Sequence, residues 1–218
     1  MFDKWRTSRV LSHRKGFCEK YGLNPDKPFV LYLGSSRNIA HDETWLIEDL
    51  RKALDDAQLE DVSIVVRPHP ANSRPYDTLQ LSGTTVMKSG YNMPATKEAI
   101  QELYDVLMHA ECVVGINTSA MLDAVCLNRP VISILADEYK ETQEEAAHFI
   151  ALRQSECIDV VATPKSVRTR LQMILEGQDS RELRRENFTK TWIWPRGKDR
   201  SAGDWATDEL EILVQEKS

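Results

Sequence analysis

The chain has 218 residues, of which 41% are hydrophobic, and this is enough apolar material for one α/β domain with a buried core. Its formal net charge of -6 argues against a general nucleic-acid binder, because such proteins present a basic face. No apolar run approaches the roughly 20 residues of a membrane span, and the N-terminus does not look like a signal peptide. The four cysteines form no CxxC pair, so we expect reduced thiols in a cytoplasmic protein and no metal site.

Residues 1–27 are polar and basic, and we expect them to form a lead-in or linker segment anchored by Trp5 and Phe17. After them, short apolar runs that end in turn residues predict six strands. Their expected ranges are 29–33, 64–66, 84–87, 112–115, 131–135 and 158–161. A loop-rich stretch is expected from Pro68 to Pro94, around the third of these strands.

Helices are expected between the strands. One follows Asp42 and turns an apolar face inward from Trp45 to Ala57. The others are expected over 98–109, 119–128 and 144–153, from Pro164 onward, and over 204–216. Because strands and helices alternate and several strands are apolar on both faces, the pattern predicts an α/β fold with a parallel sheet and helices on both faces.

Arg67 and His69 are the first candidate functional residues. A β-branched run ends at Arg67-Pro68-His69-Pro70, and the two prolines stop the strand and stiffen the turn. Open α/β sheets bind ligands at the carboxyl ends of their strands, and a fixed cation beside an imidazole suits a phosphate. The alternative is an arginine and a histidine on a solvated loop.

A second candidate site follows the fourth expected strand, where Asn117, Thr118 and Ser119 lead into a helix. Hydroxyls and free N–H groups at a helix start bind anions, and Asp123 lies one turn further on, within reach of ribose hydroxyls. Ordinary helix capping is the alternative.

Two further segments belong to the same expected edge. Ser35, Ser36 and Arg37 follow the first strand, where small residues allow the backbone to approach a ligand, although a plain turn would look the same. Gln143, after the fifth strand, is expected to line the same cleft.

The C-terminal segment carries Trp192, Trp194 and Trp205 around a Pro-Arg-Gly sequence. Aromatic residues near a terminus dock a tail on the body or meet a partner. We therefore expect three parts: the lead-in 1–27, a nucleotide-sugar-binding domain over 28–190, and a C-terminal tail and helix over 191–218.

The strings VVRPHPAN and VVGINTSAMLDAVCLNRPVISI, taken together, resemble the C-terminal half of GT-B glycosyltransferases of bacterial surface and capsular polysaccharide synthesis. The His-Pro pair is similar to that of CDP-glycerol polymerases, Kdo transferases and bacterial sialyltransferases. The stretch TSAMLDA is also similar to one in UDP-GlcNAc 2-epimerases, with Asp123 where that family has a ribose-binding glutamate. The segments ETQEEAAHF and WPRG, and the opening 40 residues, resemble the same group.

The resemblance implies a Rossmann-like domain that binds the nucleotide-activated donor of a sugar or polyol-phosphate transferase, without a metal or other cofactor. Arg67 and His69, the latter as the catalytic residue, would neutralise the leaving phosphate. Thr118 and Ser119 would hydrogen-bond this phosphate, and Asp123 would hold the ribose.

GT-B enzymes have two such domains, and this chain has one. The expected partners are therefore the nucleotide-sugar donor and either a separate acceptor-binding domain or a second copy of the chain. Two alternatives stay open, an epimerase-like enzyme that acts on a UDP-sugar and a non-catalytic module that binds a nucleotide or a protein.

Overall fold

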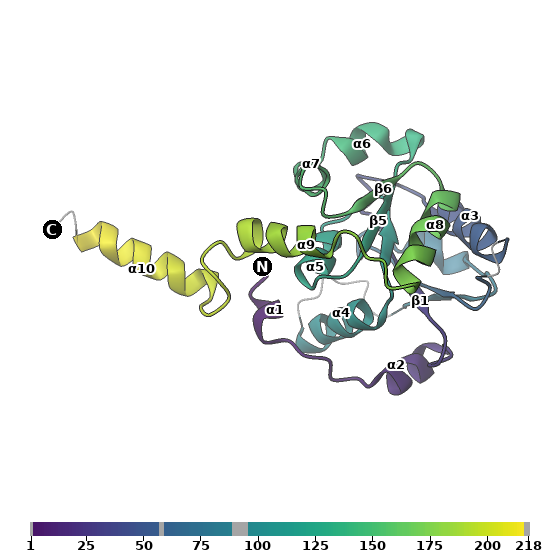
Figure 1. The fold of residues 1–218 in the computed structure, drawn as a ribbon, viewed down its shortest axis with the longest axis horizontal. Helices are drawn as coiled ribbons and strands as arrows, with labels where there is room; N and C mark the ends of the chain where they lie inside the picture. Colours follow the sequence, from purple (N-terminus) through teal and green to yellow (C-terminus); the bar gives the residue numbers. More distant parts are fainter. Residues whose placement is uncertain (1, 57–58, 89–95, 216–218) are drawn as a thin grey trace.

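The computed structural model describes residues 2–56, 59–88 and 96–215. Six strands form one sheet in the order β3-β2-β1-β4-β5-β6 (Figure 1). All neighbouring strands pair in parallel, as the sequence predicts. The strands are β1 (Phe29–Leu33), β2 (Ser63–Arg67), β3 (Thr84–Val86), β4 (Val113–Gly115), β5 (Val131–Ile134) and β6 (Asp159–Val161).

Alternate side chains of β1 divide the core into two layers. Val30 and Tyr32 pack with the apolar residues of α3 (Thr44–Asp55) and α8 (Pro164–Leu175). On the other face, Phe29, Leu31 and Leu33 pack with α2 (Arg14–Tyr21), α4 (Lys97–His109), α5 (Ala120–Cys126), α7 (Ala147–Gln154) and α9 (Glu182–Phe188). The sheet therefore has helices on both faces, which confirms the predicted fold class.

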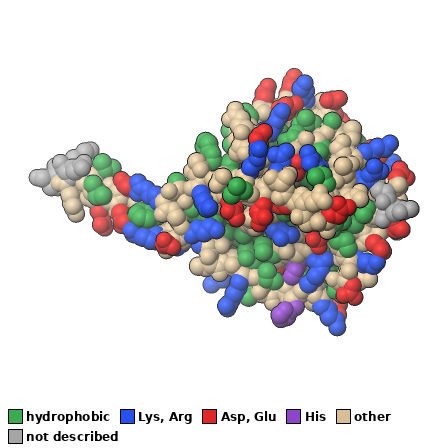
Figure 2. All heavy atoms as spheres, in the orientation of Figure 1, with side chains coloured by type: hydrophobic (Ala, Val, Ile, Leu, Met, Phe, Trp, Pro, Cys, Tyr) green, Lys and Arg blue, Asp and Glu red, His purple; other side chains and the backbone are tan. Residues whose placement is uncertain are grey.

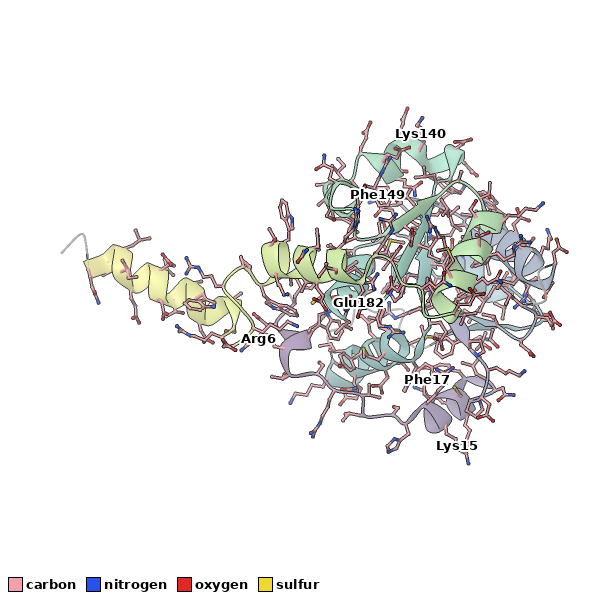
Figure 3. All side chains as sticks on the ribbon, in the orientation of Figure 1. Arg6, Lys15, Phe17, Lys140, Phe149 and Glu182 are labelled. Carbon is pink, nitrogen blue, oxygen red and sulfur yellow. The ribbon has the colours of Figure 1, made fainter. Side chains whose placement is uncertain are left out.

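The N-terminal segment is part of this core. It forms α1 (Lys4–Thr7) and α2, neither of which we expected. The side chains of Trp5 and Phe17 are 5% and 3% exposed, so both act as the expected anchors. Figure 3 labels Phe17 on α2 and Phe149 on α7, which both belong to the same core cluster.

Several expected helices differ in detail. The helix expected over 119–128 is the seven-residue α5, and Asn128 follows it with a left-handed φ of 56°. The helix expected over 144–153 is divided into α6 (Lys140–Glu144) and α7, because the backbone of Ala146 is extended. The inward orientation expected for Trp45 is wrong: this side chain is 39% exposed at the first turn of α3.

Short 3-10 turns occupy Arg74–Thr78 (η1) and Asp137–Tyr139 (η2). The loop expected between Pro68 and Pro94 therefore contains η1 and β3, and its residues 89–94 lie outside the described residues. None of the helices in the described part of the chain combines the length and apolar character that crossing a membrane requires.

The C-terminal segment leaves the body of the protein. After a π-helical turn at Thr189–Ile193 (η3), α10 (Ala202–Gln215) projects away from the sheet, and none of its residues is buried (Figure 1). Figure 2 shows acidic, basic and apolar side chains mixed along this arm. Of the tryptophans expected to cover a surface, Trp194 is buried and Trp192 is 65% exposed. Trp205 packs against the guanidinium groups of Arg196 and Arg200.

Candidate functional site

The candidate site lies where β1, β2 and β4 end. The turns that follow these strands meet at the carboxyl edge of the sheet, beside the point where the strand order reverses, and such points bind ligands in open α/β sheets. They enclose a pocket of about 240 Å³. Its lining residues are Lys4, Leu33, Gly34, Arg67, His69, Pro70, Leu103, Thr118, Ser119, Ala120 and Asp123. We call this the donor pocket.

Five predicted site residues therefore share one pocket, Arg67 and His69 on one side and Thr118, Ser119 and Asp123 on the other. The two groups come from strands that are not neighbours, since β1 lies between β2 and β4. This arrangement needs the parallel sheet, because only parallel strands bring both turns to one edge.

Arg67 ends β2 and is partly buried. Its guanidinium makes no ion pair with any described residue, and burial lowers its pKa below the ordinary value. The carboxylate of Asp123 and that of Glu102 act at longer range to oppose this shift. A cation that is partly removed from water without a close counter-ion favours an anionic ligand.

The ring of His69 is held by its own turn. The backbone N–H of Ala71 donates a hydrogen bond to Nδ1 over 3.1 Å, so the neutral ring carries its proton on Nε2. Burial, followed by the charge of Arg67, lowers the pKa of His69 below 6.5. Both effects favour the neutral ring, which offers one N–H donor at Nε2.

Gly34 allows the turns after β1 and β2 to approach closely. A Cβ atom at this position would lie 2.6 Å from the hydroxyl of Tyr76 and 3.1 Å from the backbone nitrogen of His69. Any side chain here would therefore displace the turn that carries His69.

Asp123 is 4% exposed and already has partners from the N-terminal segment. The indole N–H of Trp5 donates a hydrogen bond to Oδ1 over 2.6 Å, and Nζ of Lys4 lies 3.4 Å from the same oxygen. Burial raises the pKa of Asp123, while Lys4 and Trp5 oppose that shift. The lead-in segment thus supplies both an anchor and a second cation, Lys4, to the wall of the donor pocket, and the sequence did not indicate this role.

Three other predicted site residues belong to the interior and do not line the donor pocket. The side chain of Ser35 is fully buried and donates to Glu43. Asn117 donates to the backbone oxygen of Gln143 over 3.0 Å. The amide of Gln143 donates to the carbonyls of Ile116 and Ile134 and accepts from the N–H of Ala136. These bonds join the turns after β4 and β5, and a donor-binding role for the three side chains stays a prediction.

Glu43 is the main residue at the carboxyl edge of the sheet that sequence reasoning missed. It is fully buried, and its carboxylate accepts hydrogen bonds from the hydroxyls of Tyr32 and Tyr76 over 2.9 and 2.8 Å. The backbone N–H of Ser35 donates to it as well. Burial raises the pKa of Glu43, and these hydrogen bonds oppose the shift. No local pattern marks this carboxylate, because its partners come from three separate segments.

Asn72 also ties the edge together. Its side-chain N–H₂ donates to the carbonyls of Ser35 and Ala40 over 3.2 and 2.9 Å, which fixes the turn after β2 to the turn after β1. This residue closes the VVRPHPAN string, so its position was visible in the sequence although its role was not.

Ser36 and Arg37 lie outside the donor pocket. The carbonyl of Ser36 accepts from Ile39 and Ala40 within a tight turn, and the side chain of Arg37 is exposed. Arg37 lines a second, larger pocket of about 760 Å³, and Pro70 lines both pockets. No group of three potential metal-ligating side chains occurs among the described residues.

The comparisons with known structures agree with this geometry at the level of fold. The wall teichoic acid polymerase TagF is similar with a TM-score of 0.63 and 17% identity, over 99% of this chain and 50% of that one. The C-terminal CMP-Kdo binding domain of WaaA from Acinetobacter baumannii is similar with a TM-score of 0.50 and 12% identity, over 81% of this chain and 94% of that one. S. aureus MnaA, in a structure with UDP, gives 0.54 and 14%, over 84% and 46%.

These similarities show the fold of the donor-binding half of a GT-B glycosyltransferase, as the sequence predicted. Residues 6–200 match the family described as CDP-Glycerol:Poly(glycerophosphate) glycerophosphotransferase, and the chain belongs to that family. It spans about half the length of TagF. A comparison with curated protein sequences found no match.

Proposed function

We propose that this chain binds CDP-glycerol in the donor pocket and presents its glycerol phosphate for transfer to a poly(glycerophosphate) chain. The observation that carries the proposal is the meeting of Arg67 and His69 with Thr118 and Ser119 around one pocket. The family of the chain supports the identity of the donor.

In this proposal, the diphosphate of the donor lies between the two turns. A terminal hydroxyl oxygen of the acceptor forms a new bond to the glycerol-bearing phosphorus, and the bond from that phosphorus to the CMP oxygen breaks. The guanidinium of Arg67, Nε2–H of His69 and the two hydroxyls stabilise the charge that develops on the leaving CMP phosphate. The acceptor's proton passes to a base outside the residues of this pocket.

Asp123 is proposed to hold the ribose. Its Oδ1 atom accepts from Trp5 and lies beside Lys4, so a sugar hydroxyl would bind at Oδ2. The carboxylate would accept the hydrogen bond, as carboxylates do from ribose hydroxyls in other doubly wound folds.

The proposal includes the biological setting that the resemblance implies. The chain would serve surface-polymer synthesis from the cytoplasm, with its acceptor wall supplied by another domain or chain. Its span of about half of TagF supports this division of labour. The epimerase alternative is supported only at the level of fold, through a putative UDP-N-acetylglucosamine 2-epimerase from Listeria monocytogenes that is 15% identical to this chain, and is not favoured.

Isothermal titration with CDP-glycerol, CMP, UDP-GlcNAc and GDP tests the proposal. CDP-glycerol and CMP should bind, and His69→Ala should weaken CDP-glycerol by about fivefold through loss of one hydrogen bond. The control is His13→Ala, which changes an exposed histidine on the N-terminal segment. Preferential binding of the UDP-sugar would support the epimerase-like alternative, and no nucleotide binding at all would leave a protein-binding module.

A transfer assay tests whether the chain needs a separate acceptor-binding domain. Residues 1–218 should bind CDP-glycerol but transfer glycerol phosphate to a glycerol phosphate oligomer only when the acceptor-binding domain is supplied. Robust turnover by the chain alone, measured with light scattering to establish a monomer, would show that the chain carries its own acceptor wall.

A further inference from the structure

A second pocket lies at the same edge of the sheet, on the other side of Pro70. Its volume is about 760 Å³, and it is lined by Arg37, His41, Pro70, Ala71, Asn72, Ser73, Arg74 and Pro75. We call it the basic pocket. The turn after β1 contributes one wall and the turn after β2 the other.

The charges in this pocket are largely uncompensated. Neither Arg37 nor Arg74 makes an ion pair with a described residue. Among the described lining residues, only His41 forms an ion pair. Its Nε2 atom lies 3.8 Å from a carboxylate oxygen of Glu138. Asp42 lies next to His41, but its carboxylate accepts from the N–H and hydroxyl of Thr44. Two guanidinium groups and an imidazole that share one hollow favour an anion.

The loop that carries Arg37 is held in place from two sides. Asn72 donates to the carbonyl of Ala40, while the hydroxyls of Thr142 and Tyr139 donate to the carbonyls of Ile39 and Asp42. The backbone of the turn that carries Arg37 is therefore held in place before a ligand arrives, which lowers the entropic cost of binding.

The position of the pocket defines its ligand. It adjoins the donor pocket through Pro70, so an anion bound there would lie next to the proposed donor site. Its volume of about 760 Å³ is about three times the 240 Å³ of the donor pocket. The basic pocket can therefore hold a longer ligand, such as a segment of a polymer. The family acts on poly(glycerophosphate), whose repeating unit is a phosphodiester.

We propose that the basic pocket binds a phosphodiester of the acceptor chain, through Arg37 and Arg74, and positions the chain's terminus toward the donor pocket. This inference rests on the proposed function and assigns an acceptor subsite to it. It also gives Arg37 a ligand different from the donor phosphate that sequence reasoning predicted.

Binding of a short synthetic oligo(glycerol phosphate) tests the proposal, with CDP-glycerol titrated in parallel. Arg37→Gln and Arg74→Gln should each weaken the oligomer by about fivefold, the effect of one exposed charge pair. Each should leave the affinity for CDP-glycerol within about twofold, because separate sites act independently. The charge-matched control is Arg168→Gln on α8, which removes a guanidinium that makes no ion pair with a described residue. Thermal melting checks that each variant folds.

Three results would overturn the inference. The first is an equal loss of oligomer binding in Arg168→Gln, which would mean non-specific attraction. The second is competition between the oligomer and saturating CDP-glycerol, which would mean a single site. The third is a loss of binding to phosphatidylglycerol vesicles in Arg37→Gln with no loss for the oligomer, which would assign the pocket to a lipid headgroup.

The two parallel titrations separate this inference from the proposed function. Failure of the wild-type protein to bind CDP-glycerol would remove the proposed donor, whatever the oligomer does. Normal CDP-glycerol binding in the wild type, with unchanged oligomer binding in both arginine variants, would remove the acceptor subsite alone.

Discussion

Two kinds of polar residue meet at the carboxyl edge of the sheet, and they differ in where their hydrogen bonds go. Glu43, Asn72 and Gln143 are 0%, 6% and 0% exposed and form several bonds within the protein. Arg67 and Ser119 make no side-chain hydrogen bond with the described residues, and both line the donor pocket. The first group therefore holds the turns in place, while the second group is available to a ligand.

The largest expected effect comes from the first group. Glu43→Ala leaves the hydroxyls of Tyr32 and Tyr76 and the N–H of Ser35 buried without their acceptor. We expect a loss of about 3 kcal/mol in the free energy of unfolding, measured by urea denaturation. Glu48→Ala, at an exposed position on α3, the helix that Glu43 precedes, should change it by less than about 0.5 kcal/mol. Similar stability of the two variants would contradict the structural role of Glu43.

Arg67→Gln should have the opposite profile. We expect the affinity for CDP-glycerol to fall by about 2 kcal/mol, or about 30-fold, because a charge-assisted bond to phosphate is lost. The free energy of unfolding should not decrease, because the substitution removes a partly buried cation that has no ion-pair partner among the described residues. Titration calorimetry and urea denaturation measure the two effects. A marked destabilisation would place Arg67 among the residues that hold the edge.

Ser119→Ala should weaken CDP-glycerol by about 1 kcal/mol with no loss of stability, since its hydroxyl is exposed and does not cap α5. The matched change Ser166→Ala at the start of α8, outside the donor pocket, should leave the affinity unchanged. Equal affinities of Ser119→Ala and the wild type would remove this hydroxyl from the phosphate site.

The smallest expected effect is that of pH on donor binding. Because burial and Arg67 hold the pKa of His69 below 6.5, its ring is already neutral above that pH and binds through Nε2–H. The affinity for CDP-glycerol should therefore be constant between about pH 6.5 and about pH 8.5, a range in which the diphosphate diester does not titrate either. A steady fall in affinity over this range would mean that imidazolium binds the donor.

The sequence predicted the sheet well, because most of its strands are short apolar runs that end in turn residues; β3, with the sequence Thr-Thr-Val, is an exception. The pairing of Arg67 and His69 with Thr118, Ser119 and Asp123 followed from the same pattern, since parallel strands bring their carboxyl ends together. The helix α9 and the two N-terminal helices were not expected. They are short, and their apolar residues have no clear helical period.

The roles of the buried polar residues were harder to predict, because they depend on contacts between distant segments. Ser35, Asn117 and Gln143 have the polar groups of a ligand site, and only the folded structure shows that these groups, apart from Oδ1 of Asn117, form hydrogen bonds within the protein. Arg37 lies at the expected edge of the sheet, but it lines the basic pocket and not the donor pocket. A turn of a few residues determines on which side of Pro70 a long side chain lies, and sequence patterns do not resolve this.

The hydrogen bond between Trp5 and Asp123 joins residues 118 positions apart and depends on α1, a helix of four residues. Contacts of such long sequence separation form late in folding, because the chain must first close a large loop. A helix of a single turn also opens at low free-energy cost without unfolding the rest. Amide exchange in α1 should therefore be faster than in β1, and the donor pocket would lose one wall each time that α1 detaches. Nucleotide affinity in this protein would then depend on the folding equilibrium of a segment that contributes no strand to the sheet, although its Trp5 packs in the core.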